Sequence, residues 1–144
     1  MKKIVLIFVI LNSLLNASDS SINLKMQILE SIYGCIKSKE SMKIWSDDKQ
    51  IMDYFKSTHK FEVVSQYKDA NFIILEKIQD FIKDNSKKHI FVLNYCLLEK
   101  IPSSFGAFFW KKGRPNIVFI KPRLQKQNLH LSHKLSRYVE EQVW

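Results

Sequence analysis

The residue types that most often carry out chemistry occur in this sequence without the spacings that chemistry requires. His130 and His133 stand three residues apart, which lets two imidazoles reach one metal ion, but no third ligand is signalled nearby. Asp47 and Asp48 form a carboxylate pair, and capping of a following helix explains both. We therefore predict no metal site and no cofactor.

Nucleophile and nucleotide motifs are also missing from the sequence. There is no Gly-x-Ser-x-Gly elbow, phosphate-binding loop, dinucleotide fingerprint or Cys-x-x-Cys pair. His59 and His89 are isolated, and we expect structural roles for them. Ser103 and Ser104 fit a turn. The sequence predicts a binding protein with no catalytic residues, not an enzyme.

The densest functional signal is an aromatic run followed by a basic turn. Strand alternation across this run would send Phe108 and Trp110 to one face and Phe109 to the other. The turn that follows supplies three cations: Lys111, Lys112 and Arg114. Because Trp and Arg are enriched at binding hot spots, we predict that Trp110 and these cations bind a partner. Burial of Trp110 in the core is the alternative.

Residues 1–17 predict the compartment. Lys2 and Lys3 give a positive start, residues 4–15 an apolar run, and Ala17 a small-residue exit. A run of about a dozen residues falls short of the roughly 20 that span a bilayer. We predict a signal peptide cleaved near Ala17 and a periplasmic mature chain; retention as an N-terminal anchor is the alternative.

The two cysteines would meet an oxidising compartment. An even pair there is more often bridged than free, so we predict a disulfide between Cys35 and Cys96. Two separately buried thiols are the alternative.

Positive charge is concentrated toward the end of the chain. The formal net charge is +9, and residues 111–144 hold eight basic residues against two acidic ones, a net charge of +6. In a secreted protein this favours an acidic protein surface, anionic lipid headgroups or a small anion as partner, and nucleic acid is not expected. The alternative is that these basic residues lie on ordinary solvent-exposed faces, where they add solubility and bind no specific partner.

Periodicity predicts one α/β domain over residues 18–144. Strands are expected at 43–45, 61–64, 71–75 and 89–93, and a β-hairpin at 105–110 and 116–120. Helical spacing is expected over 22–36, 51–55, near 124 and over 132–139. Strands alternating with helices indicate three layers around a mixed, partly parallel sheet, with the hairpin followed by helix.

Two expected strand ends carry polar residues: Ser46-Asp47-Asp48 and Asn94-Tyr95. In open α/β sheets such ends meet at a crevice where ligands bind. A small-ligand module, resembling one lobe of a periplasmic solute-binding protein, is therefore an alternative function.

The last fifty residues contain a recognisable succession of segments: 105–110 (FGAFFW), 113–114 (GR), 118–120 (VFI) and 128–135 (NLHLSHKL). This order resembles the C-terminal signature of YfiR-type periplasmic regulators. The resemblance implies an α/β domain that represses an inner-membrane diguanylate cyclase by docking on the periplasmic part of that signalling protein. The sequence also allows a homodimer.

Overall fold

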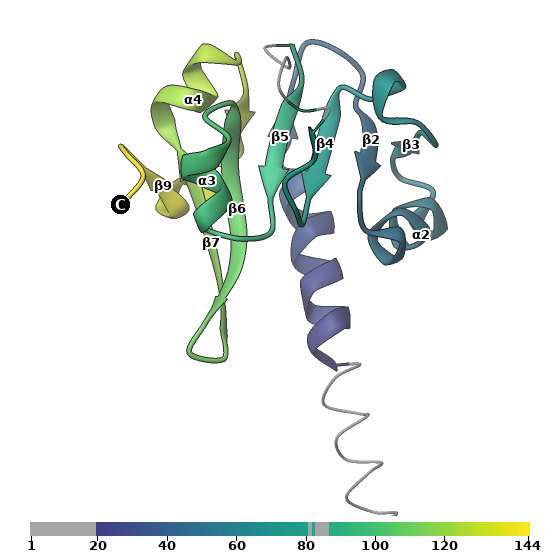
Figure 1. Cartoon of the computed structure of the whole chain (residues 1–144), viewed down its shortest axis with the longest axis horizontal. Helices are drawn as coiled ribbons and strands as arrows, with labels where there is room; N and C mark the ends of the chain where they lie inside the picture. Colours follow the sequence, from purple (N-terminus) through teal and green to yellow (C-terminus); the bar gives the residue numbers. More distant parts are fainter. Residues whose placement is uncertain (1–19, 81, 83–86) are drawn as a thin grey trace, which may run out of the picture. The chain divides into compact units, whose positions relative to one another are not determined.

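The computed structural model describes residues 20–80, 82 and 87–144 (Figure 1). The predicted signal peptide, residues 1–17, lies outside the described residues. Contacts within the chain divide it into two compact units, with the boundary between Tyr33 and Gly34. Within the described ranges, no helix combines the length and the apolar character needed to cross a membrane.

Residues 20–34 are helical, which confirms the predicted helix except at its end. Its buried side chains recur at three- and four-residue steps: Met26, Leu29, Ile32 and Tyr33. Burial raises the pKa of the Tyr33 hydroxyl well above its ordinary value. Ile36, which the periodicity placed in the helix, belongs to a strand instead.

The second unit contains a seven-stranded sheet in the order β3-β2-β4-β5-β6-β7-β9. The strands are β2 (Lys43–Ser46), β3 (Glu62–Val63), β4 (Phe72–Leu75), β5 (His89–Val92), β6 (Ser104–Lys111), β7 (Arg114–Ile120) and β9 (Val139–Glu140). Every neighbouring pair is parallel except β6 and β7, which form the predicted antiparallel hairpin. The predicted mixed α/β sheet is confirmed.

The helices of this unit are α2 (Lys49–Thr58), α3 (Cys96–Lys100) and α4 (Lys121–Lys126), with 3-10 turns at Tyr67–Asp69 and His133–Tyr138. A separate two-stranded sheet pairs β1 (Ile36–Lys37) with β8 (His130–Leu131). The helix expected over 132–139 is the second 3-10 turn followed by β9, and α3 was not predicted. Both differences involve segments of six residues or fewer, too short for helical periodicity to register.

Two aspartates organise the turn between β2 and α2. The Asp48 carboxylate accepts a hydrogen bond from the Gln50 backbone N–H at 2.8 Å, which confirms the predicted helix cap. Asp47 instead accepts from the backbone N–H groups of Glu76 and Lys77, at 2.9 and 3.0 Å. Asp47 therefore fixes the connection that leaves β4.

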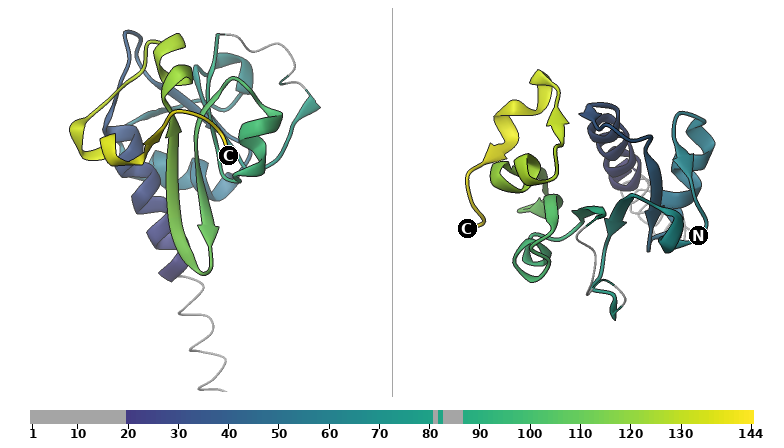
Figure 2. Two further views of the ribbon diagram at one scale, coloured as in Figure 1. Left: turned by 90° about the vertical axis from the view of Figure 1, so that its left-hand side faces the viewer. Right: turned by 90° about the horizontal axis from the view of Figure 1, so that it is seen from above.

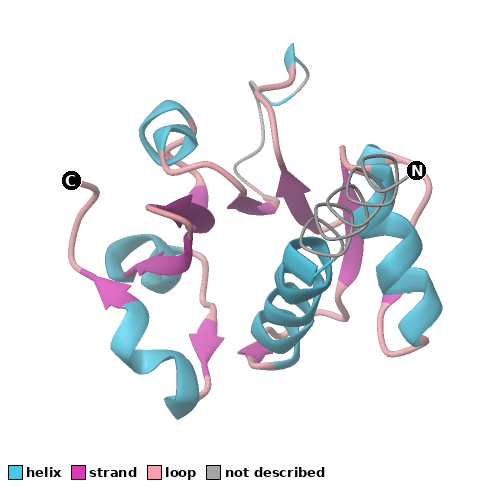
Figure 3. Ribbon diagram, turned by 90° about the horizontal axis from the view of Figure 1, so that it is seen from below, coloured by secondary structure: helices cyan, strands magenta, loops and turns pink. Residues whose placement is uncertain are grey.

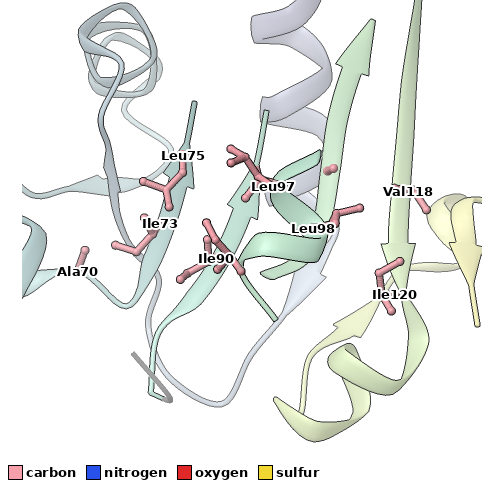
Figure 4. Packing of buried hydrophobic residues seen from close by; sticks show 11 residues of the cluster. Ala70, Ile73, Leu75, Ile90, Leu97, Leu98, Val118 and Ile120 are labelled. Atoms are coloured by element: carbon pink, nitrogen blue, oxygen red, sulfur yellow. The ribbon is translucent and has the colours of Figure 1, made fainter. Parts of the chain in front are cut away.

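Helices lie on both faces of the sheet, as the predicted three layers require. α3 contributes Leu97 and Leu98 to a buried cluster that includes Ile73 of β4 and Ile90 of β5 (Figure 4). The buried residues of α2 are outside this cluster, and α2 packs beside β2 and β3 on the opposite side (Figures 2 and 3).

The face opposite α3 is aromatic at its centre. The rings of Phe91, Phe105 and Phe119 have centroids 5.6 to 6.4 Å apart, and all three side chains are fully buried. The register between β5 and β6 shifts here, because Ile90 pairs with Ser104 and Phe91 pairs with Gly106. This bulge inserts Phe105 as an extra residue and turns Gly106 toward the rings.

No side chain fits at Gly106. A Cβ built there would lie 2.6 Å from the Val118 carbonyl oxygen and 2.8 Å from Cδ1 of Phe119. The first of these atoms belongs to the backbone, so relief of the clash requires β6 and β7 to separate. Gly34, at the end of the helix 20–34, has nothing within 4 Å of such a Cβ.

We predict that Gly106→Ala destabilises the protein by about 1–3 kcal/mol, because the added methyl overpacks the aromatic face. Gly34→Ala is the matched control and should leave stability unchanged or slightly higher. Urea unfolding followed by circular dichroism measures both. Equal midpoints for Gly106→Ala and wild type would contradict this account of the bulge.

Candidate functional site

The β6–β7 hairpin extends beyond the strands on either side of it. β5 pairs with β6 only as far as Ala107, and β9 pairs with β7 only at Phe119 and Ile120. Residues 108–117 therefore have only each other as strand partners, and they form a two-stranded projection that we call the hairpin arm (Figure 2). Both outer edges of the arm present backbone groups that no neighbouring strand of the described chain uses.

A two-residue turn closes the arm. Lys111 pairs with Arg114, so Lys112 and Gly113 form the loop, with φ values of 52° and 72°. Positive φ at both positions is typical of a type I′ turn, whose twist matches that of the strands. Gly113 adopts this backbone without cost, and Lys112 presents its side chain at the tip.

Trp110 is exposed near the tip. Phe108 and Trp110 share one face, with ring centroids 5.6 Å apart, yet Phe108 is 1% exposed and Trp110 is 43% exposed. Phe109 faces the other way and contacts the ring of Tyr95 at 5.1 Å. The predicted alternation is confirmed, and the core ends between Phe108 and Trp110.

Three cations lie at the tip of the arm, and alternation puts Lys111 and its strand partner Arg114 on the face opposite Trp110. Lys111, Lys112 and Arg114 are exposed and form no ion pair with any described residue. Together with Asn116 they line a surface hollow of about 470 Å³. The three predicted cations thus share one hollow, which Trp110 does not line, and partner binding by these four residues stays a prediction.

The polar residues at the strand ends take part in local hydrogen bonds. Asp47 and Asp48 make the hydrogen bonds described above, and the Asn94 side chain accepts from the Cys96 backbone N–H at 3.0 Å. The Tyr95 hydroxyl accepts from the Trp144 backbone N–H at 2.8 Å. A cavity with four cationic side chains in its lining lies at the other end of the strands, where β5 and β6 begin.

The predicted disulfide between Cys35 and Cys96 is wrong. Both cysteines are free thiols and they are not close to one another. Cys35 precedes β1, where its carbonyl accepts from the Ser132 backbone N–H, whereas Cys96 begins α3 after β5. Each local segment holds its cysteine in place, so the two cannot approach without disrupting strand or helix.

His130 and His133 are both exposed, on β8 and on the 3-10 turn that follows it. The described residues contain no group of three His, Cys, Asp or Glu side chains that could hold a metal ion.

Arg123 joins three segments and was not identified from the sequence. Its Nη1 donates to the carbonyl oxygens of Leu98 and Ser104, at 2.8 and 3.0 Å, and to the buried Ser104 hydroxyl at 3.2 Å. Burial lowers the pKa of its guanidinium. Arg123 of α4 thereby fixes the end of α3 against the start of β6, a role that no local spacing signals.

Comparison of the chain with protein-family models, curated proteins and solved structures found no match. The resemblance to YfiR-type regulators is not tested by these comparisons and stays a prediction.

We predict that both thiols react with a maleimide in the native, non-reduced protein, and that exposed Cys96 reacts faster than half-buried Cys35. Mass spectrometry of labelled peptides over time measures this. Added reductant should leave the melting temperature unchanged. Labelling that occurs only after reduction would show instead that Cys35 and Cys96 form a disulfide.

We predict that Arg123→Ala destabilises the protein by about 2 kcal/mol, because it leaves the Ser104 hydroxyl and two carbonyl groups without their charged donor. Arg114→Ala removes the same charge from the exposed arm and should have little effect on stability. Thermal melts of the two variants provide the comparison, and equal melting temperatures would contradict a structural role for Arg123.

Proposed function

We propose that this protein is a periplasmic regulator without enzymatic activity, which docks through its hairpin arm on an acidic periplasmic surface of an inner-membrane signalling protein. The observation that carries the proposal is the exposed Trp110 near the end of a projecting arm whose tip also carries Lys111, Lys112 and Arg114. The signal-peptide pattern of residues 1–17 and the resemblance to YfiR-type regulators support the compartment and the class of partner.

The arm has the composition of an interface anchor. Trp is among the residues most enriched at hot spots, and its two side-chain torsions cost little to immobilise. The ring already contacts Phe108, so part of its orientation is fixed before binding. The nearby cations would steer an acidic surface toward it, because charges at the rim of an interface mainly increase the rate of association.

A membrane surface is the competing target for a tryptophan among cations. Each Lys or Arg near an anionic bilayer contributes about 1 kcal/mol, so three contribute about 3 kcal/mol. That corresponds to only millimolar affinity. The arm's charge is therefore better suited to guiding a protein complex than to holding the chain on lipid.

We predict that Trp110→Ala weakens partner binding by about 2 kcal/mol, roughly 30-fold, with little loss of stability, because the ring lies beyond the core. The protein purified from cells that express the full sequence serves as bait for solubilised membranes. Proteins retained by wild type and lost with Trp110→Ala are identified by mass spectrometry, and their periplasmic domains are titrated against both forms.

Charge reversal at the tip of the hairpin arm provides a second, independent test. Lys111→Glu with Lys112→Glu should slow association and reduce its salt dependence, whereas Lys37→Glu with Lys39→Glu, the same change on another exposed segment, should not. Wild-type kinetics for the tip variant would exclude the arm from partner binding. Binding to anionic vesicles as tight as binding to the captured protein would assign the arm to lipid.

A further inference from the structure

A second surface, independent of the hairpin arm, has the features of a ligand site. A cavity of about 790 Å³ opens where β5 and β6 begin, between residues 78–80 and 82, the end of α3 and α4. Pockets for small molecules usually have volumes of about 300–1,000 Å³. We call this space the basic cavity.

The charged side chains that line the basic cavity are mostly positive. Four permanent cations line it, with one carboxylate, Asp80, among them. The cations come from separate segments: Lys88 before β5, Lys100 at the end of α3, and Arg123 and Lys126 on α4. The fold gathers charges from three segments, since only Arg123 and Lys126, three residues apart on α4, are near one another in the sequence.

Two of these cations are engaged by the protein itself. The Lys88 ammonium donates to the backbone carbonyls of Tyr67, Lys68 and Ala70, and desolvation by burial lowers its pKa. Arg123 donates Nη1 to the carbonyls of Leu98 and Ser104. Both side chains build the wall of the cavity.

The other two cations of the basic cavity, Lys100 and Lys126, are available to bind a ligand. Lys100 and Lys126 are exposed, and neither forms an ion pair within the described part of the chain. They stand in the last turns of α3 and α4. A bound anion would neutralise two ammonium groups that α3 and α4 hold beside the same space.

His89, which also lines the basic cavity, is held in one orientation. Gln127 donates Nε2 to the Ser103 carbonyl at 2.8 Å, so its Oε1 faces the His89 Nδ1 at 2.9 Å. An amide oxygen only accepts, and therefore Nδ1 carries the hydrogen. Nε2 of His89 is then the ring atom left to accept a hydrogen bond in the neutral ring, or to donate one in the charged ring.

Apolar side chains complete the cavity. Ile101 is buried beneath it, Ile82 is half-buried, and Ile78 is 52% exposed. Ile78 is one of only four large hydrophobic residues that are exposed in the described chain. An apolar group resting between these isoleucines would cover surface that water now contacts.

We propose that the basic cavity binds a small organic anion, with its acidic group between Lys100 and Lys126 and its apolar body against Ile78, Ile82 and Ile101. The acid can be a carboxylate or a phosphate monoester, since two ammonium groups recognise either. This site is independent of partner docking through the arm, and either can be wrong while the other holds.

The test is a ¹H–¹⁵N NMR titration of the protein, purified from cells that express the full sequence, with benzoate and with phenyl phosphate. We expect saturable shifts at Lys100, Ser103, Lys126 and Gln127, with a dissociation constant of roughly 1 mM or lower. Benzyl alcohol, which lacks the charge, and inorganic phosphate, which lacks the ring, should each bind about tenfold more weakly.

Lys100→Gln with Lys126→Gln should weaken benzoate binding about tenfold with an unchanged melting temperature, because both side chains are exposed. Lys37→Gln with Lys39→Gln removes the same charge elsewhere and should leave binding unchanged. Equal weakening by the two double variants would reduce the site to nonspecific attraction by net charge. Equal affinity for benzoate and benzyl alcohol, or shifts confined to the hairpin arm, would also overturn the proposal.

Discussion

Close packing of aromatic rings against the backbone at Gly106 is the constraint on which the second unit depends. The Phe91 and Phe119 rings occupy the space where any other residue would place a Cβ, and the bulge adds the ring of Phe105 beside them. The bulge also sets the alternation of the rest of β6. It therefore places Phe108 and Trp110 on the same face as Gly106, where Phe108 is buried.

The same sheet supports two surfaces with different physical character. Beyond Ala107 the hairpin loses its neighbours and becomes an arm whose few residues cannot bury Trp110. At the other end of the strands, α3 and α4 end beside the start of β5, and their last-turn lysines line the basic cavity. The arm is a projecting anchor suited to a macromolecular surface, whereas the basic cavity is concave and suited to a small anion.

The polar residues at the carboxyl ends of the strands make hydrogen bonds within the turns that follow those strands. Asp47 and Asn94 satisfy backbone N–H groups of the segments that follow β4 and β5. Unpaired N–H groups in these turns would cost free energy, and the two side chains remove that cost locally. The concave, charged space forms instead where β5 and β6 begin, braced by Arg123.

The sequence by itself determined most of the local elements and the β6–β7 hairpin, because these depend on neighbours in the chain. Alternation set the faces of Phe108 and Trp110, Gly113 allowed the tight turn, and Asp48 capped α2. Only the tertiary structure decided that Cys35 and Cys96 stay apart and that Lys100 and Lys126 converge. Periodicity reports which side of an element is buried, but distances between remote residues depend on strand order and register, which side-chain packing across the sheet selects.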